Sequence, residues 1–139
     1  MSDSPLDAKP ASPLESEARR EVERRGDPYL LWRDGADGQQ IFPLTKEWDR
    51  ATIGRSLTAD LCLSWDEEVS RVHAQLECLG DDWALVDDGL SRNGSFVNGE
   101  RVPTRRRLVD GDELRFGDTV MVYRAPFEVR EDTVVSARE

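Results

Sequence analysis

The feature that most constrains this chain is a run of short apolar segments, each ended by a turn, that occupies residues 29–129. The segments are only a few residues long, and turns rich in glycine, aspartate and asparagine separate them. This pattern is typical of β-strands, and no stretch inside the region shows the longer apolar period of a helix. The sequence therefore predicts an all-β domain, either a sandwich or a barrel, over residues 28–129.

Two local signals refine this expectation. Asn98-Gly99 separates two short apolar segments and is the strongest signal for a two-residue type I′ hairpin. Pro43 has no N–H to donate, so its strand is expected to lie at a sheet edge or to end there. The expected strands are 29–33, 40–44, 50–53, 61–63, 73–79, 83–87, 96–97, 101–102, 113–116, 119–123 and 127–129.

The remaining charged and aromatic clusters of this region are interpreted as surface turns or packing residues. Arg105-Arg106-Arg107 is expected to be a solvated loop, with attraction of an acidic partner as the alternative. The acidic runs at 66–68, 81–82 and 87–88 lack the spacing of a calcium loop and are expected to be solvated turns. The four tryptophans are expected to pack in the core or at its edge: Trp32, Trp48, Trp65 and Trp83. Cys62 and Cys78 are expected to be buried thiols, with a disulfide between them as the alternative.

The two ends of the chain differ in composition from the β region. Residues 1–27 are polar and are expected to form a flexible tail, with a short helix at 13–25 that begins at a Ser12–Glu15 capping box. Apolar residues of this helix fall four apart on one face, so a docked or partner-binding helix is the alternative to a solvated one: Leu14, Ala18 and Val22. Residues 130–139 are expected to form a second flexible tail.

Charge and composition exclude several classes of function. The 139 residues carry a net charge of −10, and most of the acidic excess lies in the β region, which disfavours nucleic acids and membrane surfaces as partners. We find neither a signal peptide nor a membrane-spanning segment, so a cytoplasmic location is expected. The single histidine, His73, has no catalytic partners marked by a motif, and no P-loop or zinc-ligand spacing is present. We therefore expect no enzyme activity, no metal and no cofactor.

Three polar segments stand out because their side chains are able to bind an oxyanion. They are Gly54-Arg55-Ser56, Ser70-Arg71-Val72-His73 and Ser91-Arg92-Asn93-Gly94-Ser95. Each falls in a predicted loop or at a strand end, and in a sandwich such loops can converge at one end of a rigid scaffold. The three segments are therefore candidates for one small anion site.

Taken in order, these segments resemble the forkhead-associated (FHA) domain family. The resemblance rests on Gly54-Arg55, on Ser70-Arg71-x-His73 and on the residues from Asn93 to Gly99. The sequence at residues 51–54, 60–63 and 109–114 also agrees with the family in order and spacing, and the resemblance covers roughly residues 28–128. It implies a β-sandwich of about eleven strands that binds phosphothreonine peptides through loops at one end.

The resemblance also implies roles for individual residues. Arg55 is expected to be the main guanidinium contact to the phosphate, Ser70 a hydroxyl donor and Arg71 a second charged ligand. Asn93 is expected to hydrogen-bond the peptide backbone, with help from Asn98.

Other motif positions are expected to shape the loops or to vary from the family. Arg92 stands where the family often has threonine, so it either adds anion attraction or faces solvent. The residues expected to be structural are Gly54, His73, Gly94 and Gly99.

The implied function is that of a phosphothreonine-dependent adaptor or regulator downstream of a Ser/Thr kinase, with a monomer favoured. The acidic run at 66–68 precedes Ser70 and is expected to disfavour acidic residues beside the phosphothreonine. Thr133 is a candidate phosphorylation site through which the tail would occupy this domain's pocket or a neighbour's. Three alternatives stay open: an interaction through the sandwich face or the N-terminal helix, a regulatory subunit of a larger assembly, and an unrecognised enzyme.

Overall fold

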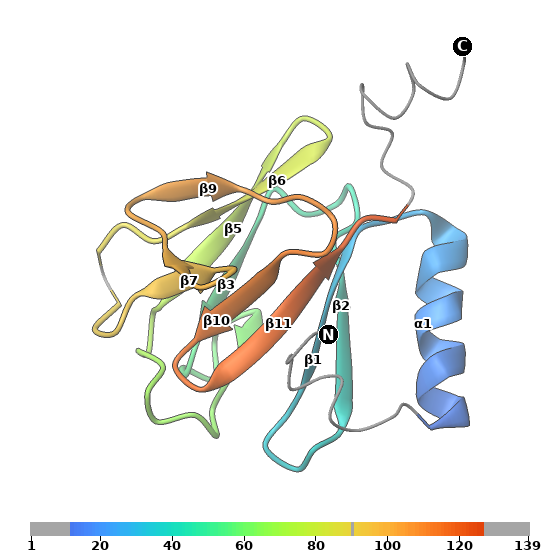
Figure 1. The fold of residues 1–139 in the computed structure, drawn as a ribbon, viewed down its shortest axis with the longest axis horizontal. Helices are drawn as coiled ribbons and strands as arrows, with labels where there is room; N and C mark the ends of the chain where they lie inside the picture. Colours follow the sequence, from blue (N-terminus) through green and yellow to red (C-terminus); the bar gives the residue numbers. More distant parts are fainter. Residues whose placement is uncertain (1–11, 90, 127–139) are drawn as a thin grey trace.

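The computed structural model describes residues 12–89 and 91–126. In these ranges it contains one helix, α1 (Pro13–Arg25), and two β-sheets (Figure 1). The strand order is β2-β1-β11-β10-β7-β8 in the first sheet and β4-β3-β5-β6-β9 in the second. The strands are β1 Tyr29–Arg33, β2 Gln39–Pro43, β3 Arg50–Gly54, β4 Leu61–Cys62, β5 Ala74–Leu79, β6 Asp82–Val86, β7 Ser95–Val97, β8 Glu100–Arg101, β9 Arg105–Arg107, β10 Glu113–Phe116 and β11 Thr119–Arg124.

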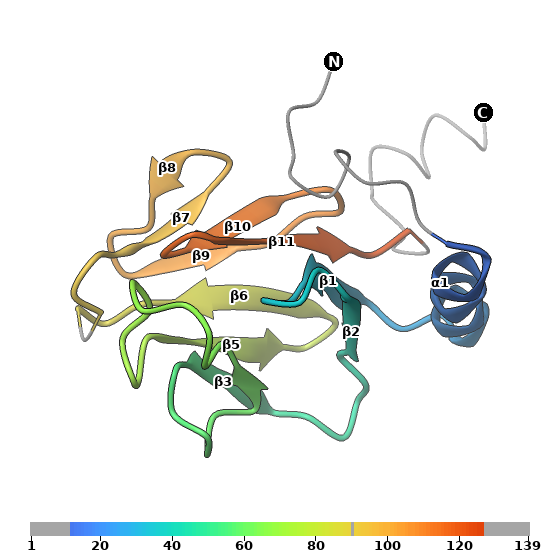
Figure 2. The ribbon, with the colours of Figure 1, turned by 90° about the horizontal axis from the view of Figure 1, so that it is seen from below.

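The two sheets form the two layers of a sandwich, seen from the edge in Figure 2. Alternate residues of the strands point between the layers, as in β11, where Thr119, Met121 and Tyr123 are buried and the residues between them are half-buried. Burial of these apolar faces provides the main driving force for the sandwich. The fully buried leucines and isoleucine of the core come from both layers: Leu30, Ile53, Leu61, Leu63, Leu76, Leu85, Leu108 and Leu114. The predicted all-β sandwich is confirmed.

The turn signals in the sequence correspond to the turns of the structure. Asn98 and Gly99 have φ angles of 52° and 85°, as a type I′ turn requires, and they connect β7 to β8. Pro43 is the last residue of β2, which is an edge strand. The strand expected at 127–129 and the tails expected at 1–11 and 130–139 lie outside the described residues.

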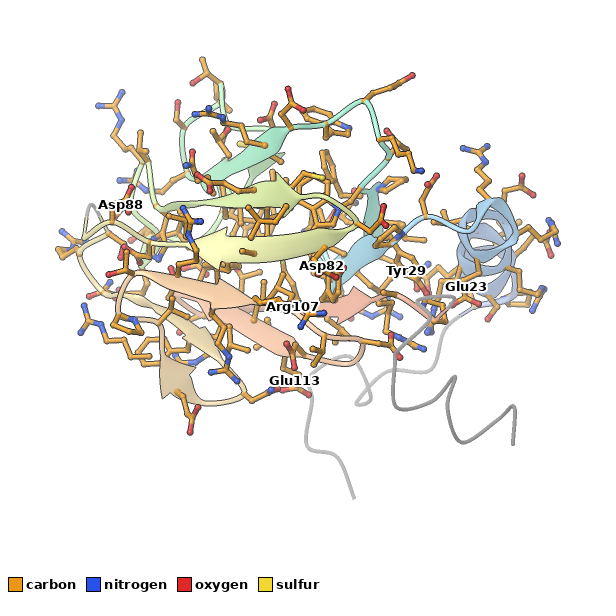
Figure 3. All side chains as sticks on the ribbon, turned by 90° about the horizontal axis from the view of Figure 1, so that it is seen from above. Glu23, Tyr29, Asp82, Asp88, Arg107 and Glu113 are labelled. Carbon is orange, nitrogen blue, oxygen red and sulfur yellow. The ribbon has the colours of Figure 1, made fainter. Side chains whose placement is uncertain are left out.

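The expectation that residues 105–107 form a solvated loop is wrong. They form β9, an edge strand that pairs with β6. Arginine is no strand signal by itself, but each of these three side chains forms an ion pair with an acidic residue of another strand: Glu77 of β5, Glu100 of β8 and Asp82 of β6 (Figure 3 labels one such pair, Asp82 and Arg107). The ion pairs are Arg105–Glu77 at 3.0 Å, Arg106–Glu100 at 3.1 Å and Arg107–Asp82 at 3.1 Å. The basic run is therefore compensated within the domain.

The expectation for the tryptophans agrees with the structure, and that for the cysteines does not. Trp32 and Trp83 are buried in the core, Trp48 packs against Phe42, and Trp65, which is 38% exposed, packs on Gly35. The two cysteines are free and only half-buried, so the expectation of buried thiols is wrong.

Helix α1 lies beside the β2 edge of the sandwich and is held there by polar contacts (Figures 1 and 2). The Glu15 carboxylate completes the capping box with Ser12 and also accepts hydrogen bonds from Arg33 at 3.0 and 3.2 Å. Tyr29 donates its hydroxyl hydrogen to Glu23, at the other end of the helix (Figure 3). The apolar positions Leu14 and Ala18 are exposed, so the face that the sequence pattern favoured for docking is not the one that docks. Within residues 12–89 and 91–126, no helix has the length and apolar character that a bilayer span requires.

Candidate functional site

The segment between β3 and β4 is bound along its main chain to the segment between β4 and β5. The Arg55 N–H donates to the Ser70 carbonyl at 3.0 Å, and the Ser56 N–H donates to the Arg71 carbonyl at 3.2 Å. Gly54 makes this approach sterically feasible, because a Cβ at this position would lie 2.1 Å from the Arg71 oxygen. Arg55 is therefore fixed directly beside Ser70 and Arg71.

The Arg55 side chain is oriented by a single hydrogen bond. Its Nε donates to the Val69 carbonyl at 3.0 Å, which leaves both terminal nitrogens of the guanidinium for a ligand. Arg71 and Arg92 are exposed. No carboxylate of the described ranges lies within ion-pair distance of these three arginines, although ion pairs hold several other arginines of the chain.

Ser70 joins the β4–β5 segment to the β6–β7 segment. Its Oγ accepts a hydrogen bond from the Arg92 N–H at 2.8 Å, so the hydroxyl hydrogen can still be donated to a ligand. Its own N–H donates to His73 Nδ1 at 3.0 Å. Ser70 thus accepts the main-chain N–H of Arg55 with its carbonyl and that of Arg92 with its hydroxyl, and it precedes Arg71 in the chain.

His73 is 1% exposed and joins the same two segments from inside the molecule. Since Nδ1 accepts the Ser70 N–H, the ring proton lies on Nε2, which donates to the Gly94 carbonyl at 2.8 Å. The ring also packs edge-on against Phe116 at 5.6 Å. In this arrangement both ring nitrogens are occupied by protein groups.

Asp87 organises the β6–β7 segment, and the expectation of a solvated turn at 87–88 is wrong for this residue. One carboxylate oxygen accepts the hydroxyls of Ser91 and Ser95 at 2.5 and 2.7 Å, and the other accepts the Gly89 N–H at 2.9 Å. Burial raises the pKa of Asp87, but the hydrogen bonds from the two serines outweigh it and hold the pKa below its ordinary value of 3.8. The signal in the sequence was the pair of serines four and eight residues further on.

Asp66 has a similar role in the β4–β5 segment and is also buried, contrary to the solvated turn expected at 66–68. One carboxylate oxygen accepts the Glu68 N–H, and the other accepts the Asp118 N–H and the Thr119 hydroxyl. These bonds attach the loop before Ser70 to the turn between β10 and β11. In the described ranges no group of three or more His, Cys, Asp or Glu side chains is arranged to hold a metal ion.

The two asparagines of the motif have different surroundings. Asn93 is exposed, and its Nδ2 donates to the Glu68 carbonyl at 2.8 Å and to the Glu68 carboxylate at 3.2 Å. Its side-chain carbonyl is left for a ligand N–H. Asn98 instead uses both side-chain atoms within the domain, donating to Asp112 and accepting from the Glu113 N–H, each at 2.9 Å.

The other two glycines of the motif, Gly94 and Gly99, both have a positive φ. Gly94 has a φ of 87° and lies under the Arg101 guanidinium, which would be 2.8 Å from a Cβ at this position. Gly99 completes the β7–β8 turn, with open space around the position of a Cβ. Thr133 lies outside the described residues.

The sandwich and its convergent polar loops define a class of protein. The sequence profile of the FHA domain matches residues 51–117, and the solved structures that this chain resembles include FHA domains at 26–31% sequence identity. The chain belongs to the FHA domain family.

Three relatives illustrate the range of this similarity. A solved FHA domain from an analysis of phosphothreonine-dependent FHA interactions is 31% identical, with a TM-score of 0.61 over 70% of this chain and 95% of its own. The oxoglutarate dehydrogenase inhibitor of Corynebacterium jeikeium is 34% identical over 99 residues, which are 70% of this chain and 65% of that protein. The transcription factor 19-like protein of Mus musculus is 42% identical over 93 residues, which are 60% of this chain and 35% of that protein. The matched parts thus span 65% and 35% of the length of these two curated relatives.

Proposed function

We propose that this chain binds a phosphothreonine of a partner protein at the loops around Ser70, and that it acts by binding and catalyses no reaction. One observation carries the proposal. Ser70 is hydrogen-bonded to the main chains of Arg55 and Arg92 and adjoins Arg71, so the main chains of three arginines meet at one serine in a chain of net charge −10. Such an arrangement fits a small, multiply charged anion on the partner.

The individual groups fit the chemistry of a phosphate monoester. A phosphothreonine carries about −1.5 to −2 charges near neutral pH and has three acceptor oxygens. The terminal nitrogens of Arg55 supply a planar pair of donors, and the Ser70 hydroxyl supplies a third donor directed by its bond with Arg92. The exposed Arg71 and Arg92 add positive charge at the rim. An unmodified threonine would leave these donors without an anion, so phosphorylation acts as the switch.

Asn93 is the candidate for the contact that recognises the peptide main chain. Its amide nitrogen is held by Glu68, so its side-chain oxygen has a fixed direction in which to accept a peptide N–H. We leave Asn98 out of the proposed contacts because Asp112 and Glu113 use both of its side-chain atoms. A single site of this size corresponds to a micromolar dissociation constant, or about −8 kcal/mol.

The similar proteins support a regulatory setting. One is a solved FHA domain with phosphothreonine-dependent interactions, and another is named as an enzyme inhibitor. We therefore propose that the chain is an adaptor or regulator that acts in the cytoplasm after a Ser/Thr kinase has modified the partner. The hypothesis that phosphorylated Thr133 competes for the same site stays a prediction.

The test is a titration with a phosphothreonine peptide library and its unphosphorylated counterpart, followed by isothermal calorimetry on the selected peptide. Wild type is compared with Arg55→Ala and with a matched control, Arg50→Ala. Arg50 is an exposed arginine at the opposite end of β3, so its loss changes the net charge equally without touching the site.

We expect the phosphorylated peptide to bind wild type and Arg50→Ala alike, and binding by Arg55→Ala to fall below detection. Equal binding by all three proteins would discard the site. Full-strength binding of the unphosphorylated peptide would instead favour an interaction that uses another surface.

A further inference from the structure

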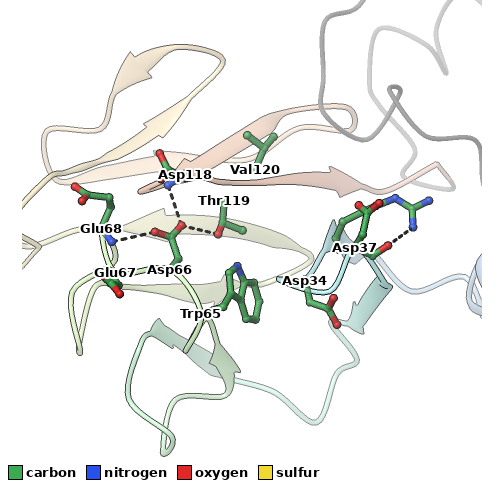
Figure 4. A pocket seen from close by; sticks show the side chains of 10 residues that line it. Asp34, Asp37, Trp65, Asp66, Glu67, Glu68, Asp118, Thr119 and Val120 are labelled. Atoms are coloured by element: carbon green, nitrogen blue, oxygen red, sulfur yellow. Dashed lines mark hydrogen bonds between the residues drawn. The ribbon is translucent and has the colours of Figure 1, made fainter.

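A groove of about 500 Å³ lies beside the proposed phosphothreonine site (Figure 4). Three segments line it: the turn between β1 and β2, the start of the β4–β5 segment, and the turn between β10 and β11. We call it the Trp65 groove. Its ionisable lining is one arginine, Arg33, and six acids: Asp34, Asp37, Asp66, Glu67, Glu68 and Asp118. The groove is therefore strongly acidic.

The acids of the groove differ in what already binds them. Asp34 accepts hydrogen bonds from the Ala36 and Gly38 N–H groups, and Asp66 accepts those described above, so both are structural. The carboxylates of Glu67 and Asp118 are exposed and have no hydrogen bond or ion pair within the described ranges. Two unpaired negative charges are thus left for a ligand.

Trp65 supplies a second, independent feature of the groove. It is 38% exposed, and its Cβ and Cγ pack so closely on the Gly35 main chain that a Cβ at Gly35 would lie 2.8 Å from each. The ring is held against the β1–β2 turn and lies in the groove between Asp66 and Asp34 (Figure 4). Trp65 thus brings a partly exposed indole to the groove lining, and an indole attracts cations, the guanidinium of arginine above all.

The groove is continuous with the phosphothreonine site through one residue. Glu68 lines the groove, and its carbonyl and carboxylate both accept from Asn93, the residue proposed to hold the peptide main chain. The next residue, Val69, accepts from Arg55. A peptide anchored by its phosphate at Arg55 and Ser70 therefore reaches the groove within a few residues, since an extended chain advances about 3.3 Å per residue.

We propose that the Trp65 groove binds an arginine or lysine side chain of the same phosphorylated partner, a proposal that rests on the proposed function. The occupant is basic because the groove offers unpaired carboxylates and a partly exposed indole, and because the carboxylates would repel an acidic or phosphorylated flank. The partner is thus recognised by two features of opposite charge: a phosphate at the arginines and a cation at the groove.

The probe is a phosphothreonine peptide in an alanine background that carries arginine, glutamine or glutamate at one flanking position at a time. Dissociation constants are measured for wild type, Trp65→Leu, the double variant Glu67→Gln/Asp118→Asn, and Asp81→Asn. The double variant keeps side-chain shape and removes the two free charges. Asp81 is an exposed acid in the β5–β6 turn, at the far end of β5 from the site, and so controls for the general field of an acidic domain.

We expect arginine to bind about five-fold more tightly than glutamine at one position or two adjacent ones, and glutamate to bind more weakly. This five-fold advantage corresponds to roughly 1 kcal/mol. It should disappear in the double variant and shrink in Trp65→Leu, while Asp81→Asn retains it and all four proteins bind the glutamine peptide alike.

The remaining outcomes separate the two proposals. If phosphothreonine peptides bind but arginine has no advantage at any position, the groove does not recognise the peptide and the proposed function stands. The same conclusion follows if the advantage is equal at all positions or is lost equally in Asp81→Asn, because it then reflects only the net charge. If no peptide of the set binds wild type, both proposals are overturned.

Discussion

The Ser70 hydroxyl should contribute separately to the stability of the fold and to the binding of a phosphorylated partner. In the free protein its oxygen accepts the Arg92 N–H at 2.8 Å, and its hydrogen is left for the ligand. Ser70→Ala removes both functions at once. A hydrogen bond between neutral groups contributes about 1 kcal/mol, and one to a charged acceptor about 1.5–3 kcal/mol. The two losses should therefore differ in size and be measurable in the same variant.

We expect the free energy of unfolding of Ser70→Ala to fall by about 1 kcal/mol. For a domain of this size such a loss lowers Tm by roughly 4–8 °C. The dissociation constant for a phosphothreonine peptide should rise roughly 10- to 100-fold, because the charge-assisted bond to phosphate is lost. Urea unfolding and calorimetric titration at one temperature give the two numbers.

Two further variants make the result decisive. Ser64→Ala removes an exposed hydroxyl from the same β4–β5 segment and should change neither quantity. Ser70→Thr retains a hydroxyl and should bind better than Ser70→Ala. If Ser70→Ala loses the expected stability but binds phosphopeptide within twofold of wild type, Ser70 is a structural residue and the proposed donor role is refuted.

Three other perturbations follow from the same structure. Gly54→Ala should destabilise the domain by about 1–3 kcal/mol, because the new Cβ would overpack against the Arg71 carbonyl, and it should weaken peptide binding. Gly38→Ala is the control, since a Cβ there would lie 3.4 Å from the nearest atom, and it should do neither. Urea unfolding compares the stabilities of the two variants. Asp87→Asn should cost roughly 2 kcal/mol at pH 7. Because the folded-state pKa of Asp87 is lowered, its contribution to stability is complete above pH 3.8 and is lost as pH falls below that value. The stabilities of wild type and variant should therefore converge in acid. An equal difference in stability between the two proteins at pH 7 and pH 3, measured by thermal unfolding, would contradict this. The hydrogen bond from Arg33 is the main cause that lowers the pKa of Glu15 from 4.5 to about 2, so docking of α1 should persist at pH 5 and be lost between 4.5 and 2. Hydrogen exchange of residues 13–25 should rise in Glu15→Gln at neutral pH but not in Glu17→Gln, whose partners lie within the helix.

The strands that were predicted correctly are those with apolar residues on an inward face. In β1 four consecutive residues are buried, and in β11 every second residue is buried. In both strands the buried positions agree with the apolar pattern of the sequence. β9 shows the limit of such patterns. Its three arginines pair with β6 through their main chain and form ion pairs with Glu77, Asp82 and Glu100, and none of these contacts is visible in a local sequence pattern.

The candidate site also contains residues that the sequence predicted and residues that only the structure revealed. Arg55, Ser70 and Asn93 became candidates because their short motifs, taken in order, resemble the FHA family. The residues that position them were missed. Asp66 and Asp87 stand in acidic runs that look like solvated turns. Asp66 is buried by a turn more than fifty residues further on, whereas Asp87 is buried among the serines that follow it closely in the chain. Trp65 was interpreted as a packing residue, and only the fold shows that it also lines a groove.

The hydrogen bonds that join Arg55, Ser70 and Arg92 exist without any partner, and they imply a kinetic consequence for the proposed site. A preformed site has no loop to order on contact, so association is an encounter between rigid surfaces, with rate constants of about 10⁵–10⁷ M⁻¹s⁻¹. Under the proposed function, partners that compete for this domain should then differ mainly in residence time. The lifetime of each complex, and not the speed of its formation, should decide which phosphorylated partner is held.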